Sequence, residues 1–172
     1  MKTRNRETMR VAADGERDVL ITRRFDAPRR LVYEAHTKPE LVKRWLRPPG
    51  WRLAVCEIDL RVDGRYLYVW RGDGDGKMMG VTGVYREIVA PEKIVATEKF
   101  DDAWYPGEAV TTHTFEERDG GTLLSLRITY ESTAARDVVI RSPMESGLAA
   151  GYDQLEEMLA AGGAAHANVS VP

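Results

Sequence analysis

The apolar positions near the C-terminus recur at the spacing of a long helix. Five of them are three or four residues apart, namely Met144, Leu148, Tyr152, Leu155 and Leu159. This spacing predicts one apolar stripe along a helix that starts near Pro143 and ends at Gly162. Ser142 precedes the helix as a candidate N-cap. No other predicted helix in the chain is as long, so we expect the remaining elements to pack around this one.

The N-terminal half of this helix is rich in small residues. Gly147, Ala149, Ala150 and Gly151 lie close together there, although a glycine in a helix interior costs about 1 kcal/mol relative to alanine. The pattern has two interpretations. Small residues allow a helix to pack closely on a sheet, or they leave room for a cavity beneath it.

Most of the chain before this helix has the alternation and the turn residues typical of β-strands. An early strand is expected at Asp18–Phe25, followed by short helices over residues 28–36 and 40–46. Six more strands are predicted, at Arg52–Leu60, Arg65–Arg71, Met78–Val89, Lys93–Phe100, Glu108–Glu117 and Thr122–Tyr130. Their connectors are short and rich in turn residues, which indicates antiparallel neighbours. A short helical segment, capped by Ser132 and ending near Ile140, leads into the long helix.

This order of elements predicts an α+β fold. One open antiparallel sheet with an aromatic face needs a cover, and the C-terminal helix is the predicted element long enough to provide it. We therefore expect a curved sheet wrapped around that helix, with a pocket between them near the helix N-terminus. Residues 18–162 are expected to form this single domain, with a flexible leader over residues 1–17 and a flexible tail over residues 163–172.

Composition and charge limit the classes of partner. The chain has 172 residues, 43% hydrophobic and 30% charged, with a formal net charge of −2. Because there is no basic excess we expect no nucleic-acid partner, and because no apolar run approaches about 18 residues we expect no membrane span. Cys56 is the single cysteine, and the N-terminus lacks the apolar core of a signal peptide. These features predict a cytoplasmic protein, which we expect to be a monomer or a homodimer.

Several stretches of the chain resemble one protein family, in the order in which they occur. They are Phe25–Trp45, Asp59–Tyr66, Gly83–Ile94, Gly120–Leu124 and Gly151–Leu159. Together they resemble the START-like (SRPBCC) superfamily and, more narrowly, the family named for the ATPase activator of heat-shock protein 90. The similarity covers about residues 18–161.

The resemblance implies a helix-grip fold of the START/Bet v 1-like type, in agreement with the α+β architecture expected above. It implies no single function, because members of the superfamily bind lipids, polyketides, hormones and other apolar molecules. Some members are cyclases or related enzymes, and the eukaryotic namesake stimulates a chaperone. This chain departs from the family pattern at His36, where relatives usually carry a large aromatic residue, and at Glu98, where they often carry an apolar or aromatic one. Both departures suggest a pocket with more polar features than average.

Residues from several predicted elements are candidates for the wall of the pocket. They are His36, Trp45, Tyr66, Tyr68, Trp70, Glu98, Trp104, His113, Met144, Leu148 and Tyr152. The aromatic residues of the strand Arg65–Arg71 share one face, which either packs as core against the helix or forms a pocket wall. Trp45 fits the core and the rim of the cavity equally well. Trp104 and Tyr105 lie in a predicted loop, either as a lid over the pocket or as packing on a neighbouring strand.

Glu98 and His113 are the candidate polar pair of this pocket. Alternation places Glu98 on the strand face that carries Ile94 and Phe100, and places His113 on the face that carries Phe115. If these faces point inward, the two residues could be cross-strand or diagonal neighbours, able to orient a ligand hydroxyl or to act as base and orienter in an enzyme. In the alternative, one or both side chains point to solvent on the outer face of the sheet.

Three functions remain open. The first is a protein that binds a small apolar or aromatic ligand between the sheet and the helix, without turnover. The second is a cyclase- or hydrolase-like enzyme that uses a Glu/His pair in the same cavity, and the third is a chaperone-interaction module. The sequence has no nucleophile elbow, no phosphate-binding glycine loop and no local metal motif. We therefore expect no cofactor and no metal, and we favour the binding protein over the enzyme.

Overall fold

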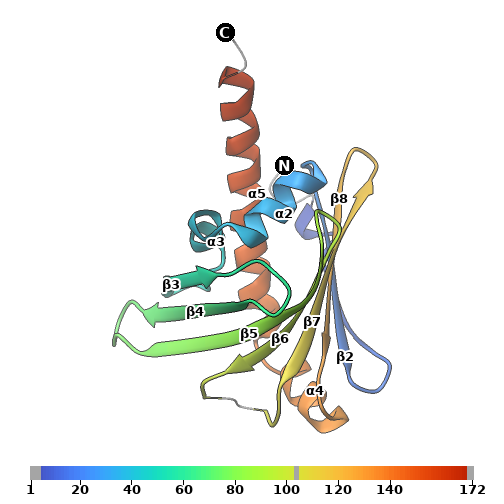
Figure 1. The fold of residues 1–172 in the computed structure, drawn as a ribbon, viewed down its shortest axis with the longest axis vertical. Coiled ribbons are helices and arrows are strands. Elements are labelled where there is room, and N and C mark those ends of the chain that lie inside the picture. The colour runs from blue at the N-terminus through green and yellow to red at the C-terminus, as the bar shows by residue number, and fades with distance from the viewer. Residues whose placement is uncertain (1–4, 103–104, 170–172) are drawn as a thin grey trace.

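In residues 5–102 and 105–169, which the structure describes, the chain forms one curved antiparallel sheet that wraps around a long helix (Figure 1). The structure is a computed structural model. The strands are β1 (Arg10–Asp14), β2 (Asp18–Phe25), β3 (Trp51–Ile58), β4 (Arg65–Gly72), β5 (Met78–Val89), β6 (Lys93–Phe100), β7 (Ala109–Arg118) and β8 (Gly121–Thr129). Their order across the sheet is β1-β2-β8-β7-β6-β5-β4-β3. The predicted α+β helix-grip fold is confirmed.

The helices lie on the concave side of this sheet or close its ends. They are α2 (Arg29–Thr37), α3 (Pro39–Trp45), α4 (Thr133–Ile140) and α5 (Met144–Val169). The helix α4 begins as predicted, because Ser132 Oγ accepts a hydrogen bond from the backbone N–H of Ala135 at 3.0 Å. From there the chain turns directly into α5, which crosses the inside of the curved sheet (Figure 1).

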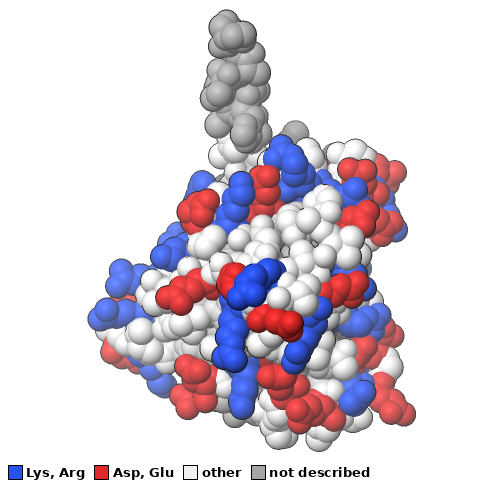
Figure 2. Space-filling view, viewed as in Figure 1, with Lys and Arg blue, Asp and Glu red and all other residues white. Residues whose placement is uncertain are grey.

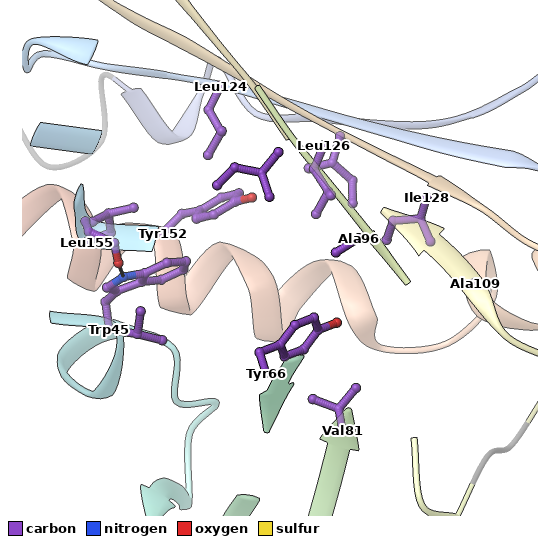
Figure 3. Packing of buried hydrophobic residues seen from close by; sticks show 14 of the residues in the cluster. Trp45, Tyr66, Val81, Ala96, Ala109, Leu124, Leu126, Ile128, Tyr152 and Leu155 are labelled. Carbon is purple, nitrogen blue, oxygen red and sulfur yellow. Dashed lines mark hydrogen bonds between the residues drawn. The ribbon is translucent and has the colours of Figure 1, made fainter. Parts of the chain in front are cut away.

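The core lies between α5 and the strands that face it. Tyr152 and Leu155 of α5 are almost completely buried, and the ring of Tyr152 meets the ring of Phe25 edge to face at 5.6 Å. Figure 3 shows Tyr152 between the helix and the strand that carries Leu124 and Leu126. Burying a large apolar side chain of this kind stabilises the fold by roughly 1.5–3 kcal/mol. The predicted apolar stripe therefore holds the helix against the sheet.

A buried arginine also ties α5 to the sheet. Arg23 of β2 has 0% exposure, and its Nη2 lies 2.8 Å from Asp153 Oδ1 and 3.5 Å from Glu156 Oε2 on α5. The guanidinium carbon Cζ of Arg23 also lies 5.4 Å from the ring centroid of Phe25 and 5.9 Å from that of Tyr152, close enough for cation–π attraction. Removing one partner of a buried charge pair leaves the other without compensation, so we expect Arg23 to matter for the position of α5.

Both chain ends differ from the sequence-based expectation. Residues 10–14, assigned to a flexible leader, form β1, which pairs with β2 through Arg10 opposite Thr22. This strand is mostly exposed, so it has no apolar alternation, and backbone hydrogen bonds hold it in the sheet. At the other end, α5 continues to Val169 instead of ending at Gly162. Alanines flank the glycine pair, and their high helix propensity favours continuation.

Charged side chains of both signs cover the surface. On the face seen in Figure 2, Lys and Arg residues are interspersed with Asp and Glu residues, and no broad patch of one sign is present there. This agrees with the formal net charge of −2. Within the described part of the chain, no helix is long and apolar enough to cross a membrane.

Candidate functional site

A pocket of about 550 Å³ lies between the concave face of the sheet and the N-terminal half of α5. Its wall is built by α2 and α3 at one end, by β4 to β8 on the sheet side, and by the connection from α4 into α5 at the other end. Most of the lining side chains are aliphatic or aromatic. Binding sites for small molecules typically enclose about 300–1,000 Å³, so this pocket has the size of a ligand site.

The structure gathers most of the candidate residues around this one pocket. Those that line it are His36, Trp45, Tyr66, Tyr68, Trp70, Glu98, His113, Met144, Leu148 and Tyr152. The remaining candidate, Trp104, lies outside the described residues, whereas its neighbour Tyr105 is buried and lines the pocket. Whether these residues hold a ligand stays a prediction.

The aromatic face of β4 forms one wall. The rings of Tyr66 and Tyr68 lie 4.9 Å apart, and the ring of Tyr85 from β5 lies 5.6 Å from Tyr66. The hydroxyl of Tyr66 donates a hydrogen bond to the Thr97 carbonyl oxygen at 2.7 Å, which fixes the ring beside β6. Burial raises the pKa of the Tyr66 and Tyr68 phenols, so both stay neutral at physiological pH. Both interpretations of this face, core packing and pocket wall, hold for Tyr66, which belongs to the core and also lines the pocket.

The small residues of α5 also divide between the two interpretations. A Cβ atom added at Gly147 would meet no atom within 4 Å, so this glycine faces open space in the pocket. A Cβ added at Gly151 would lie 3.2 Å from the backbone oxygen of Trp45, which makes Gly151 a close-packing residue between α5 and α3. Each interpretation therefore holds for one of the two glycines.

Two histidine rings meet at a tilted angle at the α2 end of the pocket. The rings of His36 and His113 lie 5.3 Å apart, and His36 also lies 4.8 Å from the Trp45 ring. Nδ1 of His36 lies 2.8 Å from the Val32 carbonyl oxygen, and because a carbonyl can only accept, Nδ1 carries the proton. Burial lowers the pKa of His36 to about 4 and that of His113 to about 3. Both rings are therefore neutral at pH 7.

Glu98 lines the sheet side of the pocket without a charged partner. In the described part of the chain its carboxyl forms no hydrogen bond and no ion pair, and the residue opposite on β7 is Ala109. Burial raises the pKa of this carboxyl from 4.5 to about 7. The carboxyl is thus close to half ionised at neutral pH and is directed at the space enclosed by the pocket.

Glu98 and His113 share the inward face, but they are not neighbours. Glu98 stands opposite Ala109, and His113 stands opposite Ile94. The two positions are therefore four residues apart along the ladder, or about 13 Å at roughly 3.3 Å per residue. The expected direct pairing is wrong, because the register of β6 against β7 brings His113 to His36 and leaves Glu98 among tyrosines.

Other lining residues were missed by the sequence analysis. Leu126 and Ile128 of β8, Tyr85 of β5 and Tyr130 after β8 all reach the pocket. A signal for the β8 residues was present, because Leu124, Leu126 and Ile128 alternate in the predicted strand and mark its inward face. Among the described residues, no group of three His, Cys, Asp or Glu side chains is placed to hold a metal ion.

Comparisons with known proteins relate the chain to one family. A model of the family described as "Activator of Hsp90 ATPase homolog 1-like protein" matches residues 26–160. A search of curated protein sequences finds no significant match.

Solved structures of similar fold come from several bacteria. A protein from Rhodobacter sphaeroides is 28% identical to this chain with a TM-score of 0.85, and the match covers 90% of this chain and 99% of the Rhodobacter protein. A protein from Chromobacterium violaceum is 30% identical with a TM-score of 0.72, and the match covers 83% of this chain and 96% of the Chromobacterium protein. An HSP90 activator from Plasmodium falciparum shares the fold at 24% identity and a TM-score of 0.50, and the match covers 66% of this chain and 72% of the Plasmodium protein.

Proposed function

This chain belongs to the Activator of Hsp90 ATPase homolog 1-like family, and we propose that it is a binding protein for one small, largely apolar molecule. The observation that carries the proposal is the pocket of about 550 Å³ between the sheet and α5. Its aliphatic and aromatic walls favour an apolar framework, because removing apolar surface from water contributes roughly 25 cal/mol per Å². The few polar groups in the wall would set the orientation of that framework.

Binding without turnover is favoured over catalysis by the positions of the ionisable groups. An enzyme that used Glu98 and His113 as base and orienter would need the two side chains within hydrogen-bond reach of each other. Glu98 and His113 are about 13 Å apart along the ladder at roughly 3.3 Å per residue, so they do not form such a pair. His36 and His113 are neutral and surrounded by aromatic rings, which suits a packing role in the wall.

The alternative role of a chaperone-interaction module rests on the family alone. The HSP90 activator from Plasmodium falciparum is 24% identical to this chain, which supports a shared fold alone. The pocket, in contrast, is a feature of this chain's own residues, and it is the feature on which the proposed function rests.

The proposal is tested by ligand-induced stabilisation. We expect 4-phenylbenzyl alcohol, a neutral aromatic probe, to raise the melting temperature in a concentration-dependent way, because a ligand that binds only the folded state stabilises it. The control is Gly147→Leu, which places a side chain in the space that Gly147 leaves open. This variant should stay folded and lose the stabilisation. An equal shift in both proteins, or no shift in the wild type, would contradict the proposal.

A further inference from the structure

Among the residues that the structure describes, one side chain in the interior of the pocket is able to carry a charge at neutral pH. Of the four basic or acidic side chains in its lining, His36 and His113 are kept neutral by burial. Arg47 is exposed, and its Nε–H donates a hydrogen bond to Gln154 Oε1 of α5 at 3.3 Å. Glu98 remains, and no described residue neutralises it.

Several tyrosines line the same pocket as Glu98. Tyr66 and Tyr68 of β4, Tyr105 before β7 and Tyr130 after β8 interact electrostatically with it, and all four are neutral phenols. On β7 the residue opposite is Ala109, which carries no polar group. The carboxyl therefore shares the pocket with tyrosine side chains and apolar residues, and no described residue on a packed element places a cation beside it.

We propose that the ligand of this pocket is a hydrophobic amine, whose ammonium group pairs with Glu98 and whose aromatic or aliphatic framework fills the apolar space. This inference rests on the proposed binding function and adds the chemical class of the ligand. A carboxylate in a pocket lined by aromatic side chains is suited to an organic cation, because the faces of aromatic rings attract positive charge and the carboxylate forms a charge-assisted hydrogen bond. Both features meet at Glu98.

Other ligand classes fit these groups less well. A ligand carboxylate would place a second negative charge beside Glu98, so one of the two would have to be protonated. A ligand hydroxyl can bond to Glu98 in either protonation state but gains no ion pair. The classes also differ in pH dependence. An ammonium group binds the ionised carboxyl, so amine affinity rises as pH increases through about 7.

Three probes with one framework separate these classes. They are 4-phenylbenzylamine, 4-phenylbenzyl alcohol and 4-phenylbenzoic acid, titrated into the full chain by calorimetry at pH 8. We expect the amine to bind at least about tenfold more tightly than the alcohol, and the acid to bind most weakly. Glu98→Gln should reduce amine affinity to the level of the alcohol and leave alcohol affinity within about twofold. The matched control Glu116→Gln makes the same charge change at an exposed site on β7 and should preserve the amine preference.

The outcomes distinguish this inference from the function on which it rests. If the alcohol binds as tightly as the amine, or if Glu98→Gln keeps the amine preference, the amine assignment is overturned while the binding function stands. If none of the three probes binds, both are overturned. Alcohol binding reports whether Glu98→Gln is folded. If Glu98→Gln unfolds, the amine affinity of the wild type is measured between pH 6 and 8 instead. We expect this affinity to rise with pH, and a flat or falling profile overturns the amine assignment.

Discussion

The ring of Tyr66 lies directly over Gly83 on the neighbouring strand. A Cβ atom added at Gly83 would clash with Cε1 of Tyr66 and with the carbonyl oxygen of Thr97. That same oxygen accepts the hydrogen bond from the Tyr66 hydroxyl at 2.7 Å. The absence of a side chain at Gly83 therefore allows the aromatic wall to lie against β6, next to Glu98.

Replacing Gly83 with alanine should displace this wall. The added methyl group meets a backbone oxygen as well as a ring, so the sheet or the ring has to move. We expect Gly83→Ala to lower the free energy of unfolding by about 1–3 kcal/mol, the usual cost of overpacking, in urea denaturation. Gly74→Ala is the control, because a Cβ there meets no atom within 4 Å. Equal stability of the two variants would show that Tyr66 does not pack on Gly83.

The two glycines of α5 should respond differently to the same substitution. Gly147→Leu extends into open space and should leave the free energy of unfolding within about 1 kcal/mol of the wild type, since leucine has the better helix propensity. Gly151→Leu meets the backbone of α3 near Trp45 and should destabilise by about 1–3 kcal/mol. Thermal and urea unfolding measure both effects. A Gly147→Leu variant as unstable as Gly151→Leu would contradict the assignment of open space.

Removing the buried arginine should weaken the attachment of α5. Arg23→Met removes the buried cation from Glu156 and leaves Asp153 with Arg6 alone, so we expect the free energy of unfolding to fall by about 3 kcal/mol. Arg127→Met is a matched control, since Arg127 also bridges two carboxylates, at 2.8 and 2.7 Å, but is 39% exposed. Its loss should cost no more than about 1 kcal/mol. Similar losses in the two variants would argue against a special role for Arg23.

The raised pKa of Glu98 predicts a pH-dependent stability difference. Between pH 4.5 and about 7 the folded state holds a proton on Glu98 that the unfolded state has released, so the wild type loses stability as pH rises through this window. Glu98→Gln lacks this loss. Its free energy of unfolding relative to the wild type should therefore increase by about 1–3 kcal/mol across the window and stay constant above it.

Urea denaturation at several pH values measures this difference. The pKa values of His36 and His113 are lowered, so the two histidines add stability as pH rises, but they are present in both proteins and cancel. A difference that does not change with pH would mean that the Glu98 carboxyl titrates normally.

The strands of the sheet were predictable because one face of each is buried. The bounds of β2 agree with the prediction at both ends, since fully buried and half-buried positions alternate without a break along this antiparallel strand. For Glu98 and His113, alternation left both the inward and the outward face open, and the structure places both residues in the lining of the pocket. In contrast, β1 was missed because it buries almost nothing.

The relations across the pocket were not predictable from local patterns. The register of β6 against β7, which separates Glu98 from His113, depends on pairing along the whole of both strands. A register shift between Tyr85 and Glu87 alters the neighbouring pair of strands in a way that alternation does not reveal. Likewise, only the position of Trp45 on another helix distinguishes Gly151, which packs closely, from Gly147, which does not.

The most direct test of the account is to determine where on the protein a small apolar molecule binds. Isotope-filtered NOE spectra of the labelled protein with 4-phenylbenzyl alcohol report which methyl groups lie within about 5 Å of the probe. The account predicts cross-peaks from the probe to Ala96, Leu126 and Leu148, which line the pocket. Cross-peaks confined to exposed methyl groups, such as those of Val62 and Val138, would contradict it.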